Sequence, residues 1–255
     1  MQLWAHRGAN RKAPENTLAA FQLAVEAGVD GVEFDVQLSN DGHPVVIHDE
    51  KLDRTTDGTG WVAVYPLESL QELDCGDGQH IPTLDEVLEL LAPTEVRLNV
   101  ELKNSVVPYP GLEAKVVSAL ARHGLLTRAA SVEPRVVLSS FDLESVRRLA
   151  RMRLAAEVAA LYEYPIFFPF RRTRNLGATA IHPHAVAVRS ARYVERAHAA
   201  GLKVRVWTVD DPTRQAELAA WGVDGIFTNS VPSSSTKGRG SSPTMPEAFG
   251  RTKNV

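Results

Sequence analysis

Cysteine is almost absent from this chain of 255 residues, in which Cys75 is the single example. One thiol cannot form an internal disulfide, so the disulfide-stapled folds of small secreted proteins are excluded and a reducing compartment is expected. The run LDCGDGQ around Cys75 is acidic. Neighbouring carboxylates raise the pKa of a thiol, which argues against Cys75 as a nucleophile and favours an inert, structural residue.

Long apolar runs and a strong net charge are also missing. The N-terminal run MQLWAHRGAN has no apolar segment of the signal-peptide kind, and YPIFFPF is too short to span a bilayer and contains Pro165 and Pro169. The net charge is −3 and the basic residues are scattered, so a nucleic-acid groove is not indicated. We therefore expect a cytoplasmic protein with no nucleic-acid partner and no stable membrane insertion. Its oligomeric state stays open.

The C-terminal residues 231–255 differ in composition from the rest of the chain. They are rich in Ser, Pro and Gly and show almost no apolar periodicity. Such a segment buries too little surface to offset the entropy of ordering it, so we expect a disordered tail with no catalytic role. Residues 1–230 are then expected to form one domain, since 44% of the chain is hydrophobic and this length suits a single large core.

Strand-like and helix-like runs alternate through the expected domain. The run QLWAH is followed by TLAAFQLAVEAG, whose apolar residues recur at helical spacing after Asn16 or Thr17 as a cap and before Gly28 as a stop. This alternation predicts parallel strands joined by crossover helices, and strands rich in Val, Ile and Leu indicate a sheet covered on both faces. The chain has one strand-like run more than the eight that close an α/β barrel.

The stretch GVEFDVQLSNDGHPVVIHDE explains the extra run. Only SNDGH separates its two apolar segments, which is far shorter than a parallel crossover, and its Asp-Gly pair is a hairpin turn signal. The second segment therefore returns antiparallel on the first, and the predicted fold is an α/β protein of the (β/α)8 barrel type. The return carries His48 back opposite Glu33 and Asp35. The alternative is a solvated hairpin with surface charges.

Charged residues stand where the chemistry of such a barrel gathers, at the C-terminal ends of its strands. Glu33 and Asp35 are two residues apart and project to one side, and Glu101 ends the strand NVEL. Buried carboxylates need a cation, and sets of oxygen ligands suit hard divalent ions such as Mg²⁺ or Ca²⁺. Arg7 and Lys103 lie at the same ends, and a metal ion with Arg and Lys around one point suits phosphate chemistry.

Two histidines complete the predicted site. His6 in AHRGAN and His48 in VIHDE titrate near neutral pH, so one can accept a proton while the other donates one. Phosphodiester hydrolysis needs both transfers, whereas either histidine alone would be interpreted as structural. Trp207 follows a later strand and is interpreted as a pocket-lining platform or as ordinary core. His182 and His184 in AIHPHA are left between loop structure and pocket wall.

The order and spacing of these motifs resemble the glycerophosphodiester phosphodiesterase family over about residues 3–230. The resemblance is carried by AHRGAN and APENT, GVEFDVQLSNDGHPVVIHDE, LDRTTDGTG, IPTLDEVL, NVELK, VVLSSF, VWTVDD and DGIFTN. It implies a TIM barrel with a small insertion after the second strand, here about residues 50–82. One departure is Asp210, at a position where the family often has Asn.

The resemblance also implies an activity, which is the hydrolysis of glycerophosphodiesters such as glycerophosphocholine or glycerophosphoethanolamine to sn-glycerol 3-phosphate and an alcohol. It implies Mg²⁺ or Ca²⁺ as the cofactor and a small-molecule substrate, and it leaves open whether water or the substrate's 2-hydroxyl is the nucleophile. The residues that it implies are His6 and His48 as the acid–base pair, Glu33, Asp35 and Glu101 as metal ligands, and Arg7 and Lys103 as phosphate contacts. Trp207 is added as a substrate contact because of its place at a strand end.

Two other functions are kept as alternatives. A lysophospholipase D-like or phospholipase C-like phosphodiesterase would use the same site, and it ranks second because the sequence shows no long apolar channel. A non-catalytic barrel that binds phosphate-bearing ligands would be favoured by the loss of a histidine or an acid, and none is lost. The run YPIFFPFRR is expected to pack on the barrel rim, with contact to a lipid-like substrate as its alternative.

Overall fold

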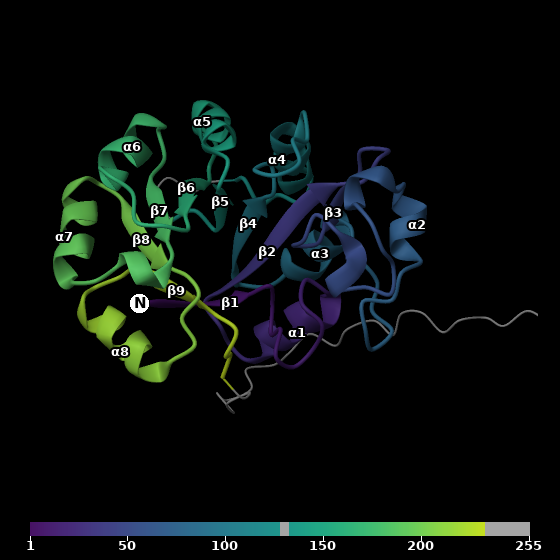
Figure 1. Ribbon diagram of the computed structural model, residues 1–255, viewed down its shortest axis with the longest axis horizontal. Helices are drawn as coiled ribbons and strands as arrows, with labels where there is room; N and C mark the ends of the chain where they lie inside the picture. The colour runs from purple at the N-terminus through teal and green to yellow at the C-terminus, as the bar shows by residue number, and fades with distance from the viewer. Residues whose placement is uncertain (128–132, 233–255) are drawn as a thin grey trace, which may run out of the picture.

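The computed structural model describes residues 1–127 and 133–232 of the chain. The tail that we expect to be disordered lies outside this description from residue 233 onward. In the described ranges, strands and helices alternate as the sequence pattern predicts, and the helices surround a ring of strands (Figure 1). No helix of these ranges has the length and apolar character needed to cross a membrane.

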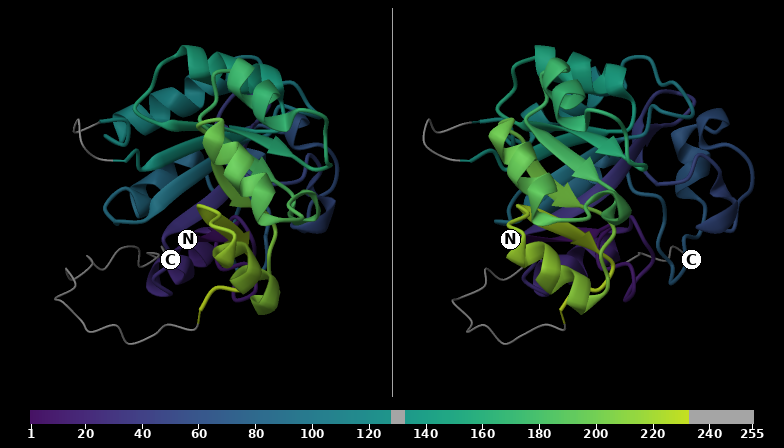
Figure 2. Two further views of the ribbon diagram at one scale, coloured as in Figure 1. Left: turned by 90° about the vertical axis from the view of Figure 1, so that its left-hand side faces the viewer. Right: turned by 60° about the vertical axis from the view of Figure 1, so that its left-hand side comes forward.

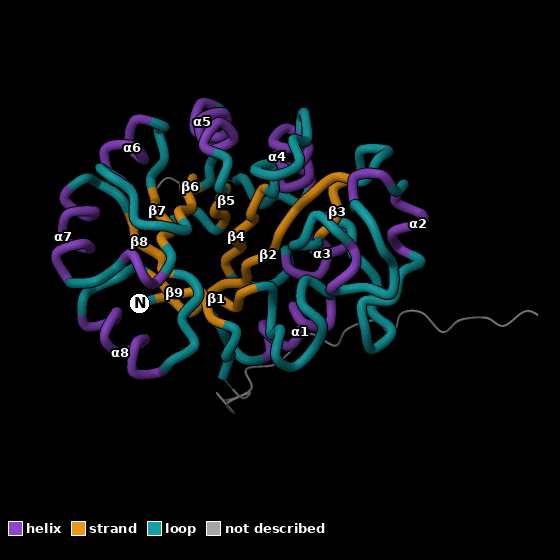
Figure 3. Tube along the Cα trace, viewed as in Figure 1, coloured by secondary structure: helices purple, strands orange, loops and turns teal. Residues whose placement is uncertain are grey.

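Eight parallel strands form the ring in the described part of the chain. They are β1 (Gln2–His6), β2 (Gly31–Leu38), β4 (Arg97–Leu102), β5 (Val136–Ser140), β6 (Glu157–Tyr162), β7 (Ala180–Pro183), β8 (Lys203–Val206) and β9 (Gly225–Thr228). Hydrogen-bonded neighbours follow the order β1-β9-β8-β7-β6-β5-β4-β2, and pairing of β1 with β2 closes the circle (Figure 3). The fold is a TIM barrel, which confirms the predicted fold class.

Helices cover the outside of the ring and connect successive strands. They are α1 (Leu18–Glu26), α3 (Leu84–Leu91), α4 (Leu112–Arg122), α5 (Leu143–Arg151), α6 (Pro169–Asn175), α7 (Ala191–Ala199) and α8 (Pro212–Ala220). The side chain of Thr17 accepts a hydrogen bond from the backbone N–H of Ala20, so Thr17 is the predicted cap of α1. Gly28 has a φ of +70°, a conformation that favours glycine after a helix end.

The predicted hairpin is present beside the barrel. Strand β3 (Pro44–Val46) pairs antiparallel with β2, with Val36 opposite Val46. Beyond the strand, the backbone N–H of Ile47 donates to the carbonyl oxygen of Asp35 at 3.0 Å. This pairing confirms why one strand-like run does not join the barrel, and it brings the chain at His48 back to the end of β2.

A short segment with its own small core follows β3. It contains the 3-10 turns η1 (Leu52–Arg54) and η2 (Val62–Val64) and the helix α2 (Leu67–Gln71), and Figure 2 shows it beside the barrel. Its core residues are Val45, Ile47, Leu52, Val62, Leu70 and Ile81. Cys75 packs against this core, where burial and the nearby carboxylates raise the pKa of its thiol to about 12. The insertion limits 50–82 and the domain limits 1–230 stay predictions.

The barrel interior contains both aromatic and polar side chains. Arg205 is fully buried, forms an ion pair with Glu157, and lies 5.2 Å from the ring of Trp4. His182 is also fully buried, with its ring 5.1 Å from that of Phe227. Burial, and then the charge of Arg205, lower the pKa of His182 well below its ordinary value. His182 is therefore an interior residue, and neither of the two sequence interpretations applies to it.

Candidate active site

A pocket opens at the C-terminal ends of the barrel strands, where the sequence predicts the chemistry. The residues that line it are His6, Arg7, Glu33, His48, Asn99, Glu101, Phe141, Leu161, Trp207 and Phe227. Polar residues come from β1, β2, β4 and the segment after β3, whereas the aromatic residues follow or end β5, β8 and β9. One wall of the pocket is thus charged and the other is apolar.

Three buried carboxylates converge at the charged wall. Glu33 and Asp35 alternate with the outward-facing residues of β2, and Asp35 is paired in register with Glu101 of the neighbouring strand β4. Each of the three residues offers an oxygen atom, and these atoms lie within 4.8 Å of one another. Parallel pairing of β2 with β4 therefore produces the predicted cluster from residues that are far apart in the sequence.

The three buried carboxylates repel one another, and either protonation or a nearby positive charge relieves this repulsion. Burial, followed by the charges of Asp35 and Glu101, raises the pKa of Glu33 well above its ordinary value. Burial also raises the pKa of Glu101, against the charge of Lys103. Asp35 behaves oppositely, because the charges of His48, Lys103 and other groups outweigh burial and lower its pKa. The neighbouring carboxyl groups therefore have pKa values shifted in opposite directions, because their surroundings differ.

Two cationic side chains contact the acids. The Nζ atom of Lys103 lies 3.1 Å from Oε1 of Glu101 and 3.8 Å from Oδ1 of Asp35. The Nε atom of Arg7 lies 3.6 Å from Oδ2 of Asp35, and the backbone N–H of Arg7 donates to Oε2 of Glu33 at 2.8 Å. Arg7 has a φ of +56°, and this left-handed conformation at the end of β1 accompanies the contact of its N–H group with Glu33.

The acid cluster fits a divalent cation. The Oδ1 atom of Asp35 is buried and accepts no hydrogen bond from the described residues, whereas Oδ2 accepts one from Asn16 at 2.9 Å. A buried carboxylate oxygen without a donor is costly unless a cation contacts it. Because the donors are all carboxylate oxygens, the set suits Mg²⁺ or Ca²⁺ better than zinc.

His6 is held by an amide side chain. Its Nδ1 atom lies 2.8 Å from Oδ1 of Asn229. Asn229 is itself oriented by Asp210, because its Nδ2 group donates to Oδ2 of Asp210 at 2.9 Å and its backbone N–H donates to Oδ1 at 2.7 Å. An amide oxygen only accepts, so Nδ1 of His6 carries the hydrogen. Burial, and then the charge of Arg7, lower the pKa of His6 to about 4.

His48 is held by a carboxylate instead. Its Nδ1 atom donates to Oδ1 of Asp49 at 2.6 Å. Asp49 accepts from Nε of Arg54 at 2.6 Å, Arg54 donates to Glu15 at 2.7 Å, and Glu15 accepts from Arg7 at 2.9 Å. This chain of charged pairs joins His48 to Arg7, which also lines the pocket. The two histidines therefore have partners of different charge.

Trp207 belongs to the apolar wall of the pocket. Its ring lies 5.5 Å from that of Phe141 and 4.9 Å from that of His184, both edge to face. Its Nε1 group donates to the carbonyl oxygen of His182 at 2.9 Å, which fixes the indole. His184 caps the 3-10 turn η3 (Ala185–Ala187), and its ring packs against that of Trp207.

Sequence reasoning placed the predicted metal, phosphate and acid–base residues at one site, and the structure brings them together. It assigned no function to Asn229, Asp49 or Asp210, which hold the histidines. The available signals were the acid directly after His48 and the Asn at the end of the last strand. Asp210 was noted only as a departure from the family pattern, whereas in the structure it orients Asn229.

Comparison with known proteins agrees with this geometry. Residues 6–232 match the sequence model of the glycerophosphoryl diester phosphodiesterase family. The chain is 39% identical over 232 residues to a glycerophosphodiester phosphodiesterase of Caldanaerobacter subterraneus subsp. tengcongensis. The aligned region covers 88% of this chain and 92% of the relative. A glycerophosphodiester phosphodiesterase of Bacillus altitudinis is 37% identical, with 89% and 94% covered.

Solved structures give the same result. A phosphodiesterase of Oleispira antarctica in complex with the product sn-glycerol-3-phosphate superposes with a TM-score of 0.77 at 33% identity, covering 90% of this chain and 93% of that one. A glycerophosphodiester phosphodiesterase of Agrobacterium tumefaciens str. C58 gives a TM-score of 0.75 at 31% identity, with 90% and 96% covered. Since the family match spans most of the sequence and relatives of this identity cover it, the chain belongs to the glycerophosphoryl diester phosphodiesterase family.

Proposed function

We propose that this protein hydrolyses small glycerophosphodiesters, such as glycerophosphocholine or glycerophosphoethanolamine, to sn-glycerol 3-phosphate and an alcohol. The observation that carries the proposal is a cluster of three buried carboxylates, two of which line one pocket together with two histidines of different partners. The names of the relatives support it, as does the product bound by the Oleispira antarctica phosphodiesterase. A reducing, cytoplasmic setting is part of the proposal and is supported by the lone Cys75.

Glu33, Asp35 and Glu101 would hold a divalent cation in this reaction. When bound, Mg²⁺ or Ca²⁺ would supply positive charge that offsets the negative charge developing on the phosphate. Lys103 and Arg7 orient the carboxylates through the contacts described above and add charge of their own. With the ion bound, the five side chains and the ion have one positive charge in excess, which suits the single negative charge of a phosphodiester.

His6 is the proposed general base. Because Nδ1–H donates to Asn229, the lone pair of the neutral ring lies on Nε2. A pKa of about 4 keeps the ring neutral at physiological pH. His6 therefore accepts the proton of the attacking oxygen, whether that oxygen belongs to water or to the 2-hydroxyl of the substrate.

His48 is the proposed general acid. Asp49 accepts a hydrogen bond from Nδ1 of His48 at 2.6 Å, which orients the ring and leaves Nε2 as the nitrogen available to a substrate in the pocket. Protonated His48 donates a proton to the leaving alkoxide, which would otherwise depart as a strong base. Arg54 binds the same carboxylate of Asp49 and keeps it ionised and in place.

The apolar wall would position the carbon atoms of the substrate. Trp207 and Phe141 meet edge to face, so their exposed faces are rigid surfaces for the glycerol or the alcohol to pack against. A Trp face also attracts a quaternary ammonium group, which makes glycerophosphocholine a suitable first substrate to test.

The test is the hydrolysis of glycerophosphocholine by the purified chain, followed by phosphorus NMR. We expect glycerol 3-phosphate and choline in the presence of Mg²⁺ or Ca²⁺, loss of turnover with a chelator, and recovery when the ion is restored. Asp35→Asn should abolish turnover, whereas Glu68→Gln, an exposed acid on α2, should not change it. Equal rates with and without a chelator, or binding without turnover, would contradict the proposal. Faster cleavage of lysophosphatidylcholine would favour the lysophospholipase alternative.

A further inference from the structure

The connection between β6 and α6 carries large apolar side chains into solvent. We call residues 164–168 the aromatic loop. Phe167 is 93% exposed, Phe168 is 74% exposed and Tyr164 is 68% exposed. Phe170, at the start of α6, is by contrast buried against Tyr193 with ring centroids 4.9 Å apart. The expectation that this run packs on the barrel rim is therefore wrong for its three exposed aromatic side chains.

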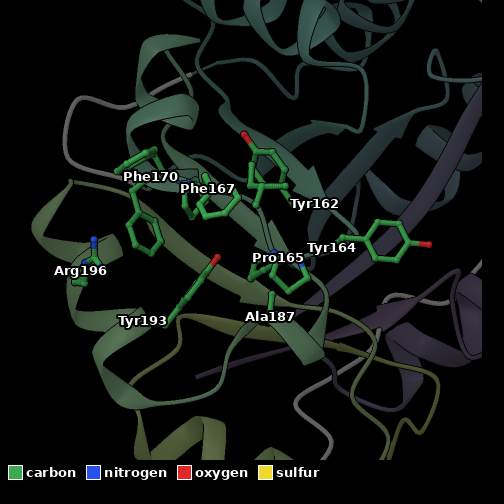
Figure 4. A pocket seen from close by; sticks show the side chains of 12 residues that line it. Tyr162, Tyr164, Pro165, Phe167, Phe170, Ala187, Tyr193 and Arg196 are labelled. Carbon is green, nitrogen blue, oxygen red and sulfur yellow. The ribbon is translucent and has the colours of Figure 1, made fainter.

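The aromatic loop stands beside the mouth of the active site. On β6, Leu161 lines the active-site pocket and the next residue, Tyr162, lines a separate groove of about 360 Å³ under the loop. Figure 4 shows Phe167 near Phe170 and Tyr162 at this groove, and the ring of Tyr164 directed away from it. Val186 of η3, also at this end of the barrel, adds a further exposed apolar side chain. The loop and the catalytic pocket thus share the same face of the barrel.

Unpaired arginines surround the aromatic loop. They are Arg171, Arg172, Arg174, Arg189, Arg192 and Arg196, and all are exposed. None of them forms an ion pair with a residue in the described ranges. Between residues 163 and 198, only Glu163 and Glu195 carry negative charge, although the chain as a whole has a net charge of −3. This face is therefore locally positive on an acidic protein.

Four of these arginines lie at the same end of the barrel as the aromatic loop. Arg171 and Arg172 are the third and fourth residues of α6, which begins directly after the loop. Arg189 follows η3, and Arg192 is in the first turn of α7. Since helices of a TIM barrel begin at the C-terminal ends of the strands, all four lie near the level of the loop.

We propose that this face binds the surface of an anionic phospholipid bilayer, with Phe167 and Phe168 inserted among the lipids and the four arginines on the phosphate groups. Aromatic side chains beside basic residues are the combination that holds proteins in the interfacial region of a membrane. Binding in this way turns the mouth of the active site toward the bilayer without any segment that crosses it. The proposal does not depend on which phosphodiester the enzyme cleaves.

Charge distinguishes this partner from two others. In a symmetric dimer through the same face, the arginines of one copy would meet those of the other, which is unfavourable. A nucleic acid would satisfy the arginines, but phosphate contacts dominate such binding, whereas here the apolar ring of Phe167 is almost fully exposed. An anionic bilayer satisfies both the charge and the apolar surface.

The test is cosedimentation of the full chain with vesicles of phosphatidylcholine that contain phosphatidylglycerol, compared with vesicles of phosphatidylcholine alone. We expect binding to the anionic vesicles only, weakened by salt. Phe167→Ser with Phe168→Asn should reduce the partition coefficient by about tenfold or more, since both rings leave the bilayer. Asn suits the left-handed φ of +54° at residue 168. Arg171→Gln with Arg172→Gln should reduce it by roughly fivefold for each arginine.

The matched control is Arg151→Gln with Arg153→Gln. It removes two exposed arginines at and just after the C-terminal end of α5, and it should leave vesicle binding unchanged. The loop variants should hydrolyse soluble glycerophosphocholine at the wild-type rate and keep the wild-type melting temperature. The proposal is overturned by absence of wild-type binding, by equal binding to neutral vesicles, or by loop variants that bind like the wild type. Binding to a single-stranded oligonucleotide without binding to vesicles also overturns it.

Discussion

The Nδ1 atom of His6 lies 2.8 Å from Oδ1 of Asn229, although 223 positions separate the two residues in the chain. Closure of the barrel, in which β1 pairs with β9, brings them together. Asp210 fixes the amide so that its oxygen faces His6. The first residue of the proposed acid–base pair is thus positioned by the residue that follows the last strand of the fold.

This contact predicts a shift of the pH profile in Asn229→Asp. The new carboxylate favours protonated His6 and raises its pKa from about 4. Because a protonated base is inactive, the acid limb of kcat/KM should move to higher pH. The exposed Asn175→Asp on α6 is the control and should leave the limb in place. An unchanged profile in Asn229→Asp would exclude His6 as the base that sets this limb.

Substrates with different leaving groups should separate the two histidines. His6→Ala and His48→Ala should each lower turnover of glycerophosphocholine by about a hundredfold or more. With a p-nitrophenyl ester of glycerol phosphate the leaving group needs no proton, so His48→Ala should lose less than about tenfold while His6→Ala stays impaired. The opposite pattern would mean that the acid and base assignments must be exchanged.

The acid cluster should limit the stability of the metal-free protein. In the chelated protein at neutral pH, Glu33→Gln removes a buried carboxyl group whose ionisation is opposed by burial and by the charges of Asp35 and Glu101. We expect its melting temperature to rise by about 2–4 °C for each kcal/mol of relief, while activity is lost. Glu68→Gln again serves as the exposed control. A lower melting temperature for Glu33→Gln would show that the three carboxylates stabilise each other without an ion.

His182 should make the fold sensitive to acid. Its pKa is lowered in the folded state, first by burial and then by Arg205, whereas in the unfolded chain it is about 6.5. The unfolded state therefore binds an extra proton below about pH 6.5, and the free energy of unfolding falls by up to about 1.4 kcal/mol per pH unit as the pH decreases. Urea unfolding of His182→Leu should show a flatter pH dependence. A slope equal to that of the wild type would contradict this assignment.

The acid cluster was predictable because it depends on short-range rules. Glu33 and Asp35 share a side through the two-residue period of a strand, and parallel strands end at one edge, which adds Glu101 and Lys103. The hairpin was predictable from the length of its linker. The contacts of the histidines were not, because Asn229 reaches His6 only through barrel closure, and Arg54 reaches Asp49 only through the fold of the segment after β3.

The exposure of the aromatic loop, by contrast, could not be predicted from the sequence. A short apolar run usually packs, and composition gives no indication that Phe170 turns inward while Phe167 faces solvent. The outcome depends on the backbone at the end of β6, where Phe168 has a left-handed conformation and α6 begins at Pro169. Such a local backbone path is not encoded by apolar periodicity.

The most direct measurement of the central claim is a calorimetric titration of Mg²⁺ or Ca²⁺ into the chelator-treated protein, with glycerophosphocholine turnover followed at each addition. If Glu33, Asp35 and Glu101 hold one catalytic ion, turnover should saturate together with a single bound equivalent, and Asp35→Asn should lose both. Full turnover before any ion binds, or an Asp35→Asn variant that binds the ion as the wild type does, would contradict the account.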